Sequence, residues 1–194
     1  MRPIIVFSGP SGSGKNTIIS ELLRQRDDVA YSVSVTSRKP RPGEKNGQNY
    51  IFVTPKEFEQ KINENEFLEW AKYLDNYYGT SRKEIEKIQR QNKFPLLDLD
   101  TQGALNLKRR GENVFTIFIK PPSLKILEQR LRKRGTDSEQ EIQKRLKNAS
   151  KEMAFADKYD FVVVNDSLDK TVQTIDDLLN QLASSDSRRN AENR

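Results

Sequence analysis

A Gly-rich turn near the N-terminus, placed directly after a short apolar run, most constrains the fold of this chain. Residues 4–7 read IIVF, which is typical of a strand buried on both faces of a parallel sheet. The turn occupies residues 9–14, and apolar residues at helical spacing begin at Ile18. A strand, a Gly-rich loop and a helix in this order predict a phosphate-binding turn.

The turn matches the first seven positions of the phosphate-loop pattern G-x-x-x-x-G-K-[ST]. Its glycines allow successive backbone N–H groups to face one anion, and the following helix adds its positive N-terminal end. Lys15 can reach the β- and γ-phosphates of a nucleotide. The alternative is a Gly/Ser-rich turn with a solvated lysine. The residues expected to bind the nucleotide are Gly9, Pro10, Ser11, Gly12, Ser13, Gly14, Lys15, Asn16 and Thr17.

The eighth position of the loop departs from the pattern. Asn16 stands where Ser or Thr normally contacts Mg²⁺, and Thr17 follows one residue later. An amide oxygen can ligate Mg²⁺, although it does so less commonly than a hydroxyl in this loop. Phosphate binding by the loop is therefore expected, whereas metal binding by the loop stays open.

Apolar strands alternate with amphipathic helices along most of the chain, which predicts an α/β fold with a parallel sheet flanked by helices. The 194 residues are enough for one compact domain. Shorter alternating segments between residues 34 and 80 interrupt this rhythm, and we interpret them as an inserted small α+β subdomain. The expected strands are 50–53, 67–73, 94–100, 114–119 and 161–164, with a turn at 76–79 and helices at 81–91, 124–131, 142–153 and 168–182. The polar residues 184–194 are expected to form a disordered tail.

The absence of two residue types limits the possible chemistry. The chain contains no cysteine and no histidine, which excludes disulfides, thiolate metal sites, catalytic triads with histidine and an imidazole base. Phosphoryl transfer suits this limit because it depends on positioning and charge neutralisation more than on proton shuttling. The net charge of +6 is compatible with a solvated basic surface, nucleic acid, an anionic membrane or small phosphorylated ligands.

The segment at residues 94–100 ends in two acids. In an extended strand side chains alternate, so Asp98 and Asp100 would point the same way. Ligands of open parallel sheets lie at the carboxyl ends of the strands. The two carboxylates could hold a hydrated Mg²⁺ or accept hydrogen bonds from a ligand, and the alternative is a strand that simply ends in solvent. Asp98, Asp100 and Asn16 are candidate metal ligands, and no metal ligand is assigned among them.

The arginines form two sets. Arg38 and Arg41 bracket Pro40, and the prolines of this segment hold it extended. Arg130 and Arg134 share a face of a predicted helix, and Arg145 lies on the next helix. Each set could be a solvated basic face. We favour two groups that close on a chain of phosphates from different sides, because a phosphate loop and acids accompany them.

Taken together, these segments resemble the guanylate kinase family. The resemblance extends from about residue 3 to about residue 183. It is carried by residues 9–15, Ser34-x-x-x-Arg38-x-x-Arg41-Pro42-Gly43-Glu44, Tyr50, residues 67–70, residues 76–80, Asp98-x-Asp100-x-Gln102-Gly103 and Arg134-Gly135-Thr136-Asp137. The resemblance implies a core at 1–33, 83–121 and 156–183, a monophosphate-binding insertion at 34–82 and a helical lid at 122–155.

The resemblance also implies an activity, which is transfer of the γ-phosphoryl group of ATP, carried as Mg-ATP, to GMP and dGMP, giving ADP and GDP. It assigns catalysis to Lys15, Arg38, Arg130, Arg134 and Arg145. It assigns the acceptor monophosphate to Arg38, Arg41, Tyr50 and Tyr78, and the guanine to Ser34, Glu69, Thr80 and Asp100, with Asp98 also among the substrate-binding residues. The expected state is a monomer or a homodimer.

The chemistry of Glu69 supports guanine independently of the resemblance. The pairing edge of guanine offers N1–H and the 2-amino group as adjacent donors, and a carboxylate accepts both. Adenine has a lone pair at N1, so the same carboxylate would meet repulsion. A buried acceptor left unpaired typically costs about 1–3 kcal/mol, which is a basis for rejecting AMP. The alternative is that Glu69 is a surface acid beside Trp70.

Other functions stay as alternatives. Some scaffold proteins carry a guanylate-kinase-like domain that binds peptides, but that class predicts a degraded phosphate loop, whereas Lys15 is present. Nucleic acid binding would predict a stacking platform, which is not found in the sequence, so no nucleic acid partner is expected. The first apolar run is too short for a secretion signal or a membrane span, so a cytoplasmic location and no membrane partner are expected.

Overall fold

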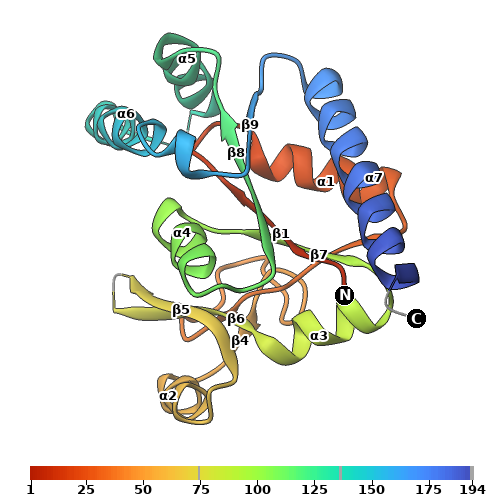
Figure 1. Cartoon of the computed structure of the whole chain (residues 1–194). Helices are drawn as coiled ribbons and strands as arrows, with labels where there is room; N and C mark the ends of the chain where they lie inside the picture. The colour runs from red at the N-terminus through yellow and green to blue at the C-terminus, as the bar shows by residue number, and fades with distance from the viewer. Residues whose placement is uncertain (74, 136, 193–194) are drawn as a thin grey trace.

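The computed structural model describes residues 1–73, 75–135 and 137–192 of the chain, with side chains for these except 73 and 186–192. Thr136, part of the motif at residues 134–137, therefore lies outside the described residues. No helix within these described ranges is both long and apolar enough to cross a bilayer. Figure 1 shows the chain as a main sheet with helices on both faces and a second, smaller sheet.

The main sheet has five parallel strands, in the order β2-β7-β1-β8-β9. Its strands are β1 (Ile4–Ser8), β2 (Val29–Tyr31), β7 (Phe94–Asp98), β8 (Val114–Lys120) and β9 (Phe161–Val164). Every residue of the central strand β1 is buried, as expected for a strand covered on both faces. The α/β fold with a parallel sheet is thereby confirmed.

Alternate side chains of β1 belong to two separate cores, because successive residues of a strand point to opposite faces. Ile5 and Phe7 pack with α1 (Lys15–Gln25) and α7 (Leu168–Glu192). Ile4 and Val6 belong to a second core on the opposite face of the sheet. That second face is covered by α3 (Arg82–Arg90) and α4 (Thr101–Arg109). Figure 1 shows α1 and α7 together on one side of the sheet.

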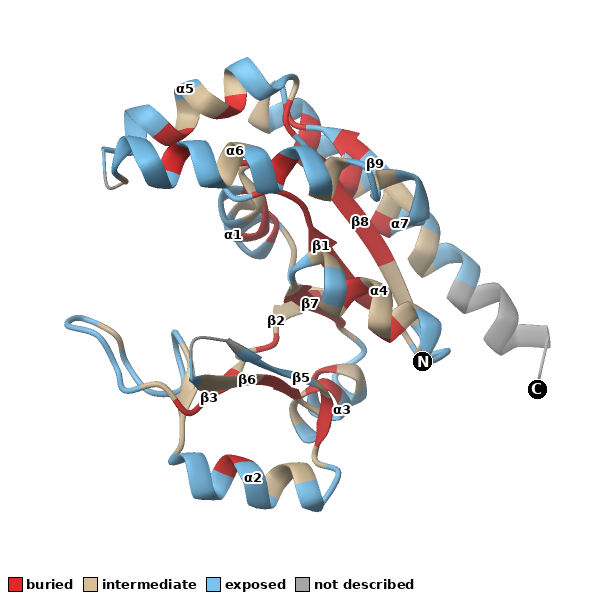
Figure 2. Cartoon of the chain, turned by 90° about the vertical axis from the view of Figure 1, so that its left-hand side faces the viewer, coloured by how far each residue is buried: buried red, intermediate tan, exposed pale blue. Residues whose placement is uncertain are grey.

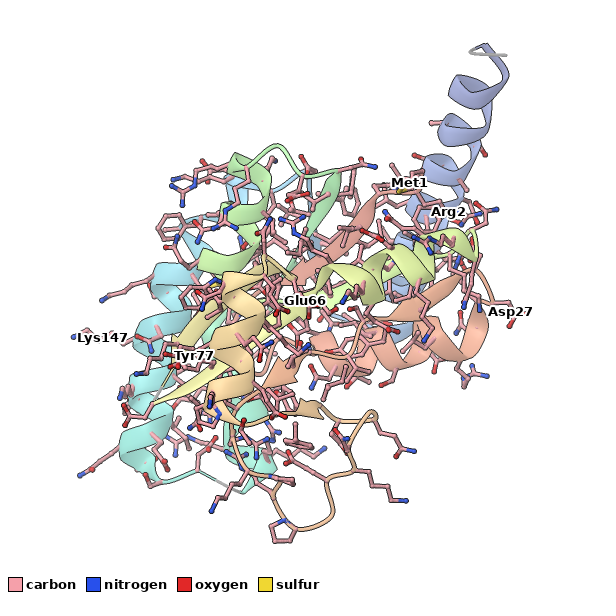
Figure 3. The ribbon with its side chains drawn as sticks, turned by 90° about the horizontal axis from the view of Figure 1, so that it is seen from below. Met1, Arg2, Asp27, Glu66, Tyr77 and Lys147 are labelled. Carbon is pink, nitrogen blue, oxygen red and sulfur yellow. The ribbon has the colours of Figure 1, made fainter. Side chains whose placement is uncertain are left out.

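The second sheet is built from residues between 35 and 81 and has mixed strand directions, in the order β4-β3-β6-β5. Its elements are β3 (Val35–Thr36), β4 (Ile51–Phe52), β5 (Phe67–Tyr73) and β6 (Asn76–Ser81), covered by α2 (Pro55–Asn63). Phe58 of α2 stacks on the rings of Phe67 and Tyr77, with centroid separations of 4.3 and 5.2 Å. Figure 3 shows Tyr77 beside α2 in this layer.

A pair of helices stands at the opposite end of the molecule from the small sheet (Figure 2). The pair consists of α5 (Leu124–Arg134) and α6 (Glu139–Met153), and a 3₁₀ turn, η1 (Ala156–Lys158), leads from it to β9. The two helices share a small core of their own around Leu127, Leu131 and Ile142. Because this core is separate from those of the main sheet, the pair forms its own packing unit.

The structure differs from the sequence-based expectations at several elements. Residues 76–79, expected as a turn, belong to β6, and the chain reverses before them, with Asp75 at a left-handed φ of 62°. Helix α4 was not expected, because Gly103 in its first turn weakens the helical signal. Where we expected a disordered tail, α7 continues to Glu192. Extending an existing helix adds one hydrogen bond per residue without a new nucleus, and Ser184 and Ser185 also bond to carbonyls one turn earlier.

Candidate functional site

The phosphate-loop turn lies between β1 and α1, as the pattern predicts. Its backbone requires glycine at two positions. A Cβ at Gly9 would lie 2.3 Å from the carbonyl oxygen of Ile119, and one at Gly14 would lie 2.3 Å from Nδ2 of Asn165. The Ser13 amide closes the turn by donating to the Pro10 carbonyl at 3.0 Å. The turn is therefore fixed by close contacts as well as by its own hydrogen bonds.

The Lys15 side chain folds back over this turn. Its Nζ donates to the Gly9 carbonyl at 2.7 Å and lies 3.9 Å from Oδ1 of Asp98. Burial raises the pKa of the Asp98 carboxyl, and the nearby Lys15 ammonium opposes this shift. The cation of the loop thus faces the acid at the end of β7, so both predicted groups come to one place.

A cavity of about 730 Å³ opens above the turn, and we call it the P-loop cavity. It brings together three kinds of group: the turn, the acids at the end of β7, and charged side chains from α5 and α6. Its lining residues are Gly9, Ser11, Gly12, Gly14, Lys15, Asn16, Thr17, Asp98, Leu99, Asp100, Arg130, Arg134 and Glu152. Most of the predicted nucleotide-binding residues and two of the predicted lid arginines therefore line one cavity.

Two arginines of the helix pair also hydrogen-bond the turn itself. Nη2 of Arg130 donates to the Asn165 carbonyl at 2.8 Å, and its Nη1 lies 3.5 Å from the Ser13 carbonyl. Nη1 of Arg145 donates to Oγ of Ser11 at 2.6 Å. Arg134 is exposed and lines the cavity without such a bond in the described part of the chain. All three predicted lid arginines are thus brought to the phosphate loop or its cavity.

A second cavity of about 230 Å³ lies between the small sheet and the acids at the end of β7, and we call it the Glu69 cavity. Its lining residues are Ser34, Tyr50, Glu69, Trp70, Ala71, Tyr78, Gly79, Asp98, Leu99, Asp100, Gln102, Gly103, Asn106 and Arg110. Asp98, Leu99 and Asp100 line both cavities. Ligands in the two cavities would therefore be separated only by the short segment after β7.

The carboxylate of Glu69 is held by a side chain of the neighbouring strand, β6. The fully buried Thr80 donates its hydroxyl to Oε1 of Glu69 at 2.7 Å. Burial raises the pKa of the Glu69 carboxyl above its ordinary value, and the Thr80 hydrogen bond opposes that shift. Asp100 raises this pKa further, and Arg110 lowers it. The hydrogen bond from Thr80 to one carboxylate oxygen orients the Glu69 side chain, and Glu69 lines the Glu69 cavity.

The predicted monophosphate residues are only partly gathered in this structure. Tyr50 and Tyr78 line the Glu69 cavity, with ring centroids 6.0 Å apart. Arg38 makes a bidentate ion pair with Glu44 at 2.8 and 3.0 Å and lies over the Tyr50 ring at 5.4 Å. Arg41 is exposed, and its backbone amide donates to the same carboxylate at 2.7 Å. Neither arginine lines the Glu69 cavity.

The two acids at the end of β7, Asp98 and Asp100, differ in how they are held. Asp98 is the last residue of the strand, whereas Asp100 lies beyond it and caps α4, accepting a hydrogen bond from the Gly103 amide at 2.7 Å. The expected strand to residue 100 is therefore wrong at its end, because the capping interaction ends the extended segment. Both acids nevertheless line both cavities.

The candidate metal ligands do not form a complete coordination site for a metal ion. Among the described residues, no group of three or more Asp, Glu, His or Cys side chains could hold an ion. Asp98, Asp100 and Asn16 all line the P-loop cavity. Mg²⁺ usually keeps several waters and binds one or two carboxylates together with substrate phosphates. The donor set therefore fits a magnesium ion that arrives with a nucleotide, and does not fit a resident ion.

Sequence reasoning missed Glu152, a half-buried acid that α6 contributes to the P-loop cavity. Burial raises the pKa of its carboxyl; Lys15 opposes the shift, and Asp100 adds to it. One signal could have found it: Glu152 lies two helical turns after Arg145 and hence on the same face of α6. Arg110, Asn106 and Gln102 of the Glu69 cavity come from or just beyond α4, which was not expected.

Known proteins resemble this chain over most of its length. A family model described as guanylate kinase matches residues 1–182. The guanylate kinase of Rickettsia felis is 46% identical over 176 residues, covering 91% of this chain and 92% of that protein. The guanylate kinase of Desulfitobacterium hafniense is also 46% identical, covering 91% of this chain and 88% of that protein. A crystal structure of guanylate kinase from Anaplasma phagocytophilum aligns with a TM-score of 0.71 at 34% identity, covering 93% of this chain and 85% of that one.

Proposed function

The chain belongs to the guanylate kinase family, and from this premise we propose which of its residues bind the two nucleotides and assist the transfer between them. The enzyme transfers a phosphoryl group from ATP to GMP, giving ADP and GDP. One observation carries the assignment of residues: the P-loop cavity and the Glu69 cavity meet at Asp98, Leu99 and Asp100. A nucleotide bound in the first cavity would therefore lie next to a nucleotide bound in the second, as direct transfer between them requires.

We assign the P-loop cavity to ATP. The backbone N–H groups of the turn and of the first turn of α1 bind its phosphates, with Pro10 contributing none, because a helix N-terminus favours anions. Lys15, which already donates to the Gly9 carbonyl, turns its remaining donors to the β- and γ-phosphates. Its proximity to Asp98 places the positive charge at the side of the cavity that borders the Glu69 cavity.

Magnesium accompanies ATP in this proposal. Asp98 and Asp100 would bind the water shell of the ion, and Asn16 is a further possible contact, since all three line the P-loop cavity. The ion supplies charge neutralisation on the phosphates. The chain itself supplies the loop amides and arginines that orient the same phosphates.

We assign the Glu69 cavity to GMP and dGMP. One oxygen of Glu69 is fixed by Thr80, so the carboxylate can receive the N1–H and 2-amino donors of guanine. Ser34 and Asp100 complete the surroundings of the base, and Asp98 lies at the boundary with the P-loop cavity. The assignment predicts that AMP is rejected.

The monophosphate of the acceptor is assigned to Arg38, Arg41, Tyr50 and Tyr78. The tyrosines support this because both line the cavity. Arg38 lies against the Tyr50 ring and would exchange part of its bond to Glu44 for the phosphate. A doubly charged phosphate competes well with a single carboxylate for a guanidinium.

The transfer itself needs no general base, because the attacking oxygen of the acceptor phosphate is already ionised. Arg130, Arg134 and Arg145 neutralise the charge that develops on the transferred group. They belong to the helix pair at residues 122–155, which we propose as a lid that closes over the substrates and excludes water. Residues 34–82 form the monophosphate-binding part, and residues 1–33, 83–121 and 156–183 the core.

The experiment that tests this function compares acceptors under saturating Mg-ATP in a coupled assay of ADP formation. GMP and dGMP are expected to be phosphorylated, with AMP, UMP and dTMP turned over far more slowly. Equal use of AMP would contradict the assignment of Glu69. Both substrates are cytoplasmic nucleotides, so the proposal includes a cytoplasmic enzyme that acts as a monomer or homodimer.

A further inference from the structure

Asp137 precedes Ser138, the N-cap of α6, and its side chain is only 8% exposed. Its Oδ1 accepts a hydrogen bond from Nη2 of Arg145 at 3.1 Å. Its Oδ2 is buried and has no hydrogen-bond partner within the part of the chain that the structure describes. A buried carboxylate normally takes several donors, so a carboxylate with one arginine as its only described side-chain partner calls for an explanation.

The arginine that Asp137 holds also reaches the phosphate loop. Nη1 of Arg145 donates to Oγ of Ser11 at 2.6 Å, and Ser11 lines the P-loop cavity. The guanidinium is planar and its donors form a rigid fork, so fixing one terminal nitrogen sets the direction of the other. With Nη2 bonded to Asp137, Nη1 points toward Ser11 of the P-loop cavity.

Neighbouring charged residues of the helix pair lack this arrangement. Arg132 pairs with Glu139 and Glu128, but Arg132 and Glu139 are 46% and 57% exposed, and neither lines the P-loop cavity. Lys147, which follows Arg145 closely on α6, points away from the molecule in Figure 3. A buried carboxylate that aims an arginine at the loop is thus specific to Asp137 and Arg145 among these pairs.

We propose that Asp137 is a positioning residue for phosphoryl transfer, holding Arg145 so that its second terminal nitrogen meets a nucleotide phosphate at the rim of the P-loop cavity. This inference rests on the role proposed above for Arg145. A phosphate oxygen is a stronger acceptor than the Ser11 hydroxyl. With its other side held by Asp137, Arg145 can exchange the hydroxyl for the phosphate while losing little additional side-chain freedom.

The first test replaces Asp137 by Asn, which keeps the size and one acceptor oxygen but removes the charge. We expect kcat to fall about tenfold, the scale of one weakened charge-assisted hydrogen bond, while KM for GMP is unchanged. The matched control is Glu139→Gln, which alters the exposed ion pair of the same helices and should leave kcat within about twofold. An unchanged kcat in Asp137→Asn would overturn the inference.

The second test is a double-mutant cycle with Arg145→Met. If Asp137 acts through Arg145, Asp137→Asn should lower kcat by less than about twofold once Arg145 is gone. An equal loss in both backgrounds would mean that Asp137 has only a structural role, and would overturn the inference while leaving the role of Arg145 intact. Normal turnover in Arg145→Met alone would remove the proposed role of Arg145 and the inference with it.

Thermal melting of each variant checks that the fold is retained. Should Asp137→Asn fail to fold, the cycle is run with Asp137→Glu, which keeps the charge but displaces it by one methylene. The expectation is the same: a loss of kcat that disappears in the Arg145→Met background. Equal losses in the two backgrounds would again overturn the inference.

Discussion

Thr80 on β6 donates its hydroxyl to Oε1 of Glu69 on the adjacent strand β5 at 2.7 Å, and these two residues are register partners in the small sheet. The bond fixes the carboxylate at the wall of the Glu69 cavity. In the proposed assignment, recognition of guanine therefore depends on a pair of neighbouring strands. This relationship leads to two predictions about the acceptor.

Glu69→Gln should reduce kcat/KM for GMP by about 10- to 100-fold, since an unpaired buried polar group typically costs about 1–3 kcal/mol. The amide keeps the shape but turns a donor toward the donors of guanine. The KM for ATP should stay the same, because Glu69 does not line the P-loop cavity. Initial rates at varied GMP and ATP test both statements.

The matched control is Glu59→Gln. Glu59 accepts a hydrogen bond from the Tyr77 hydroxyl at 3.1 Å on the exposed side of the small sheet and lies outside the Glu69 cavity. Its substitution should leave GMP kinetics unchanged. Equal effects of the two substitutions would show that the small sheet is merely sensitive to lost charge, and would refute base recognition by Glu69.

The pH dependence of GMP use should respond to Thr80. Burial raises the pKa of Glu69, and the Thr80 hydrogen bond lowers it by favouring the charged form. Thr80→Val removes that bond at similar volume, so the pKa should rise further. In the proposed assignment the ionised form of Glu69 binds guanine, so kcat/KM for GMP should be lost as pH falls through this pKa. The acid limb of the profile should therefore move to higher pH in the variant.

The measurement is log kcat/KM for GMP against pH for both proteins. The GMP phosphate also titrates, with a second pKa of about 6, but it does so equally for both enzymes and cancels in the comparison. An acid limb that stays in place would contradict the assignment.

The stability of the fold should also depend on Glu69. Because the pKa of this carboxyl is raised in the folded state, ionising it destabilises the fold as pH rises above 4.5, the ordinary pKa of a glutamate.

The strands and the phosphate loop could be predicted because their signals are local. The apolar run before the loop, the glycines and Lys15 lie within a few residues, and apolar periodicity identifies a buried strand without its partners. The acids at the end of β7 were expected at a ligand site from the rule that ligands lie at strand ends. Asp100 nevertheless reaches that site as the cap of α4, a helix that the sequence did not indicate.

Pairings between distant segments could not be predicted. Arg145 and Ser11 are 134 residues apart, and only the packing of α6 over the loop brings them together. Glu152 also reaches the P-loop cavity only through the packing of α6, and its sole sequence signal is the spacing of two helical turns from Arg145. Arg38 was expected to bind phosphate, but whether Glu44 would occupy it depends on loop geometry.

Lys15→Met should lower turnover by about 10²–10³-fold, the usual scale for removing one group that stabilises transferring charge. Methionine has similar length and keeps the packing of the stem. GMP binding should be unaffected, because Lys15 does not line the Glu69 cavity. Trp70 does line that cavity, is 45% exposed and is the only tryptophan, so its fluorescence should change when GMP binds in the proposed site.

The control for that readout is Trp70→Phe, which should abolish the fluorescence change on adding GMP while retaining turnover. A Lys15→Met protein with near-normal ADP formation would refute the assignment of the P-loop cavity to ATP. A variant that lost both turnover and the GMP signal would point to a folding defect, which thermal melting against the wild-type protein identifies.

The last prediction concerns Asn16 and magnesium. The side chain lines the P-loop cavity at the position where a hydroxyl usually contacts Mg²⁺. Asn16→Thr restores that hydroxyl, so the gain in ADP affinity on adding Mg²⁺ should be larger in the variant than in the wild-type protein. Calorimetric titration of ADP with Mg²⁺ and with a chelator measures the gain in each. In the chelator the two proteins should bind ADP equally, because the loop amides and Lys15 are unchanged. A gain of equal size in both proteins would mean that the loop side chain does not contact the ion, leaving the phosphates, water and the acids at the end of β7 as its surroundings.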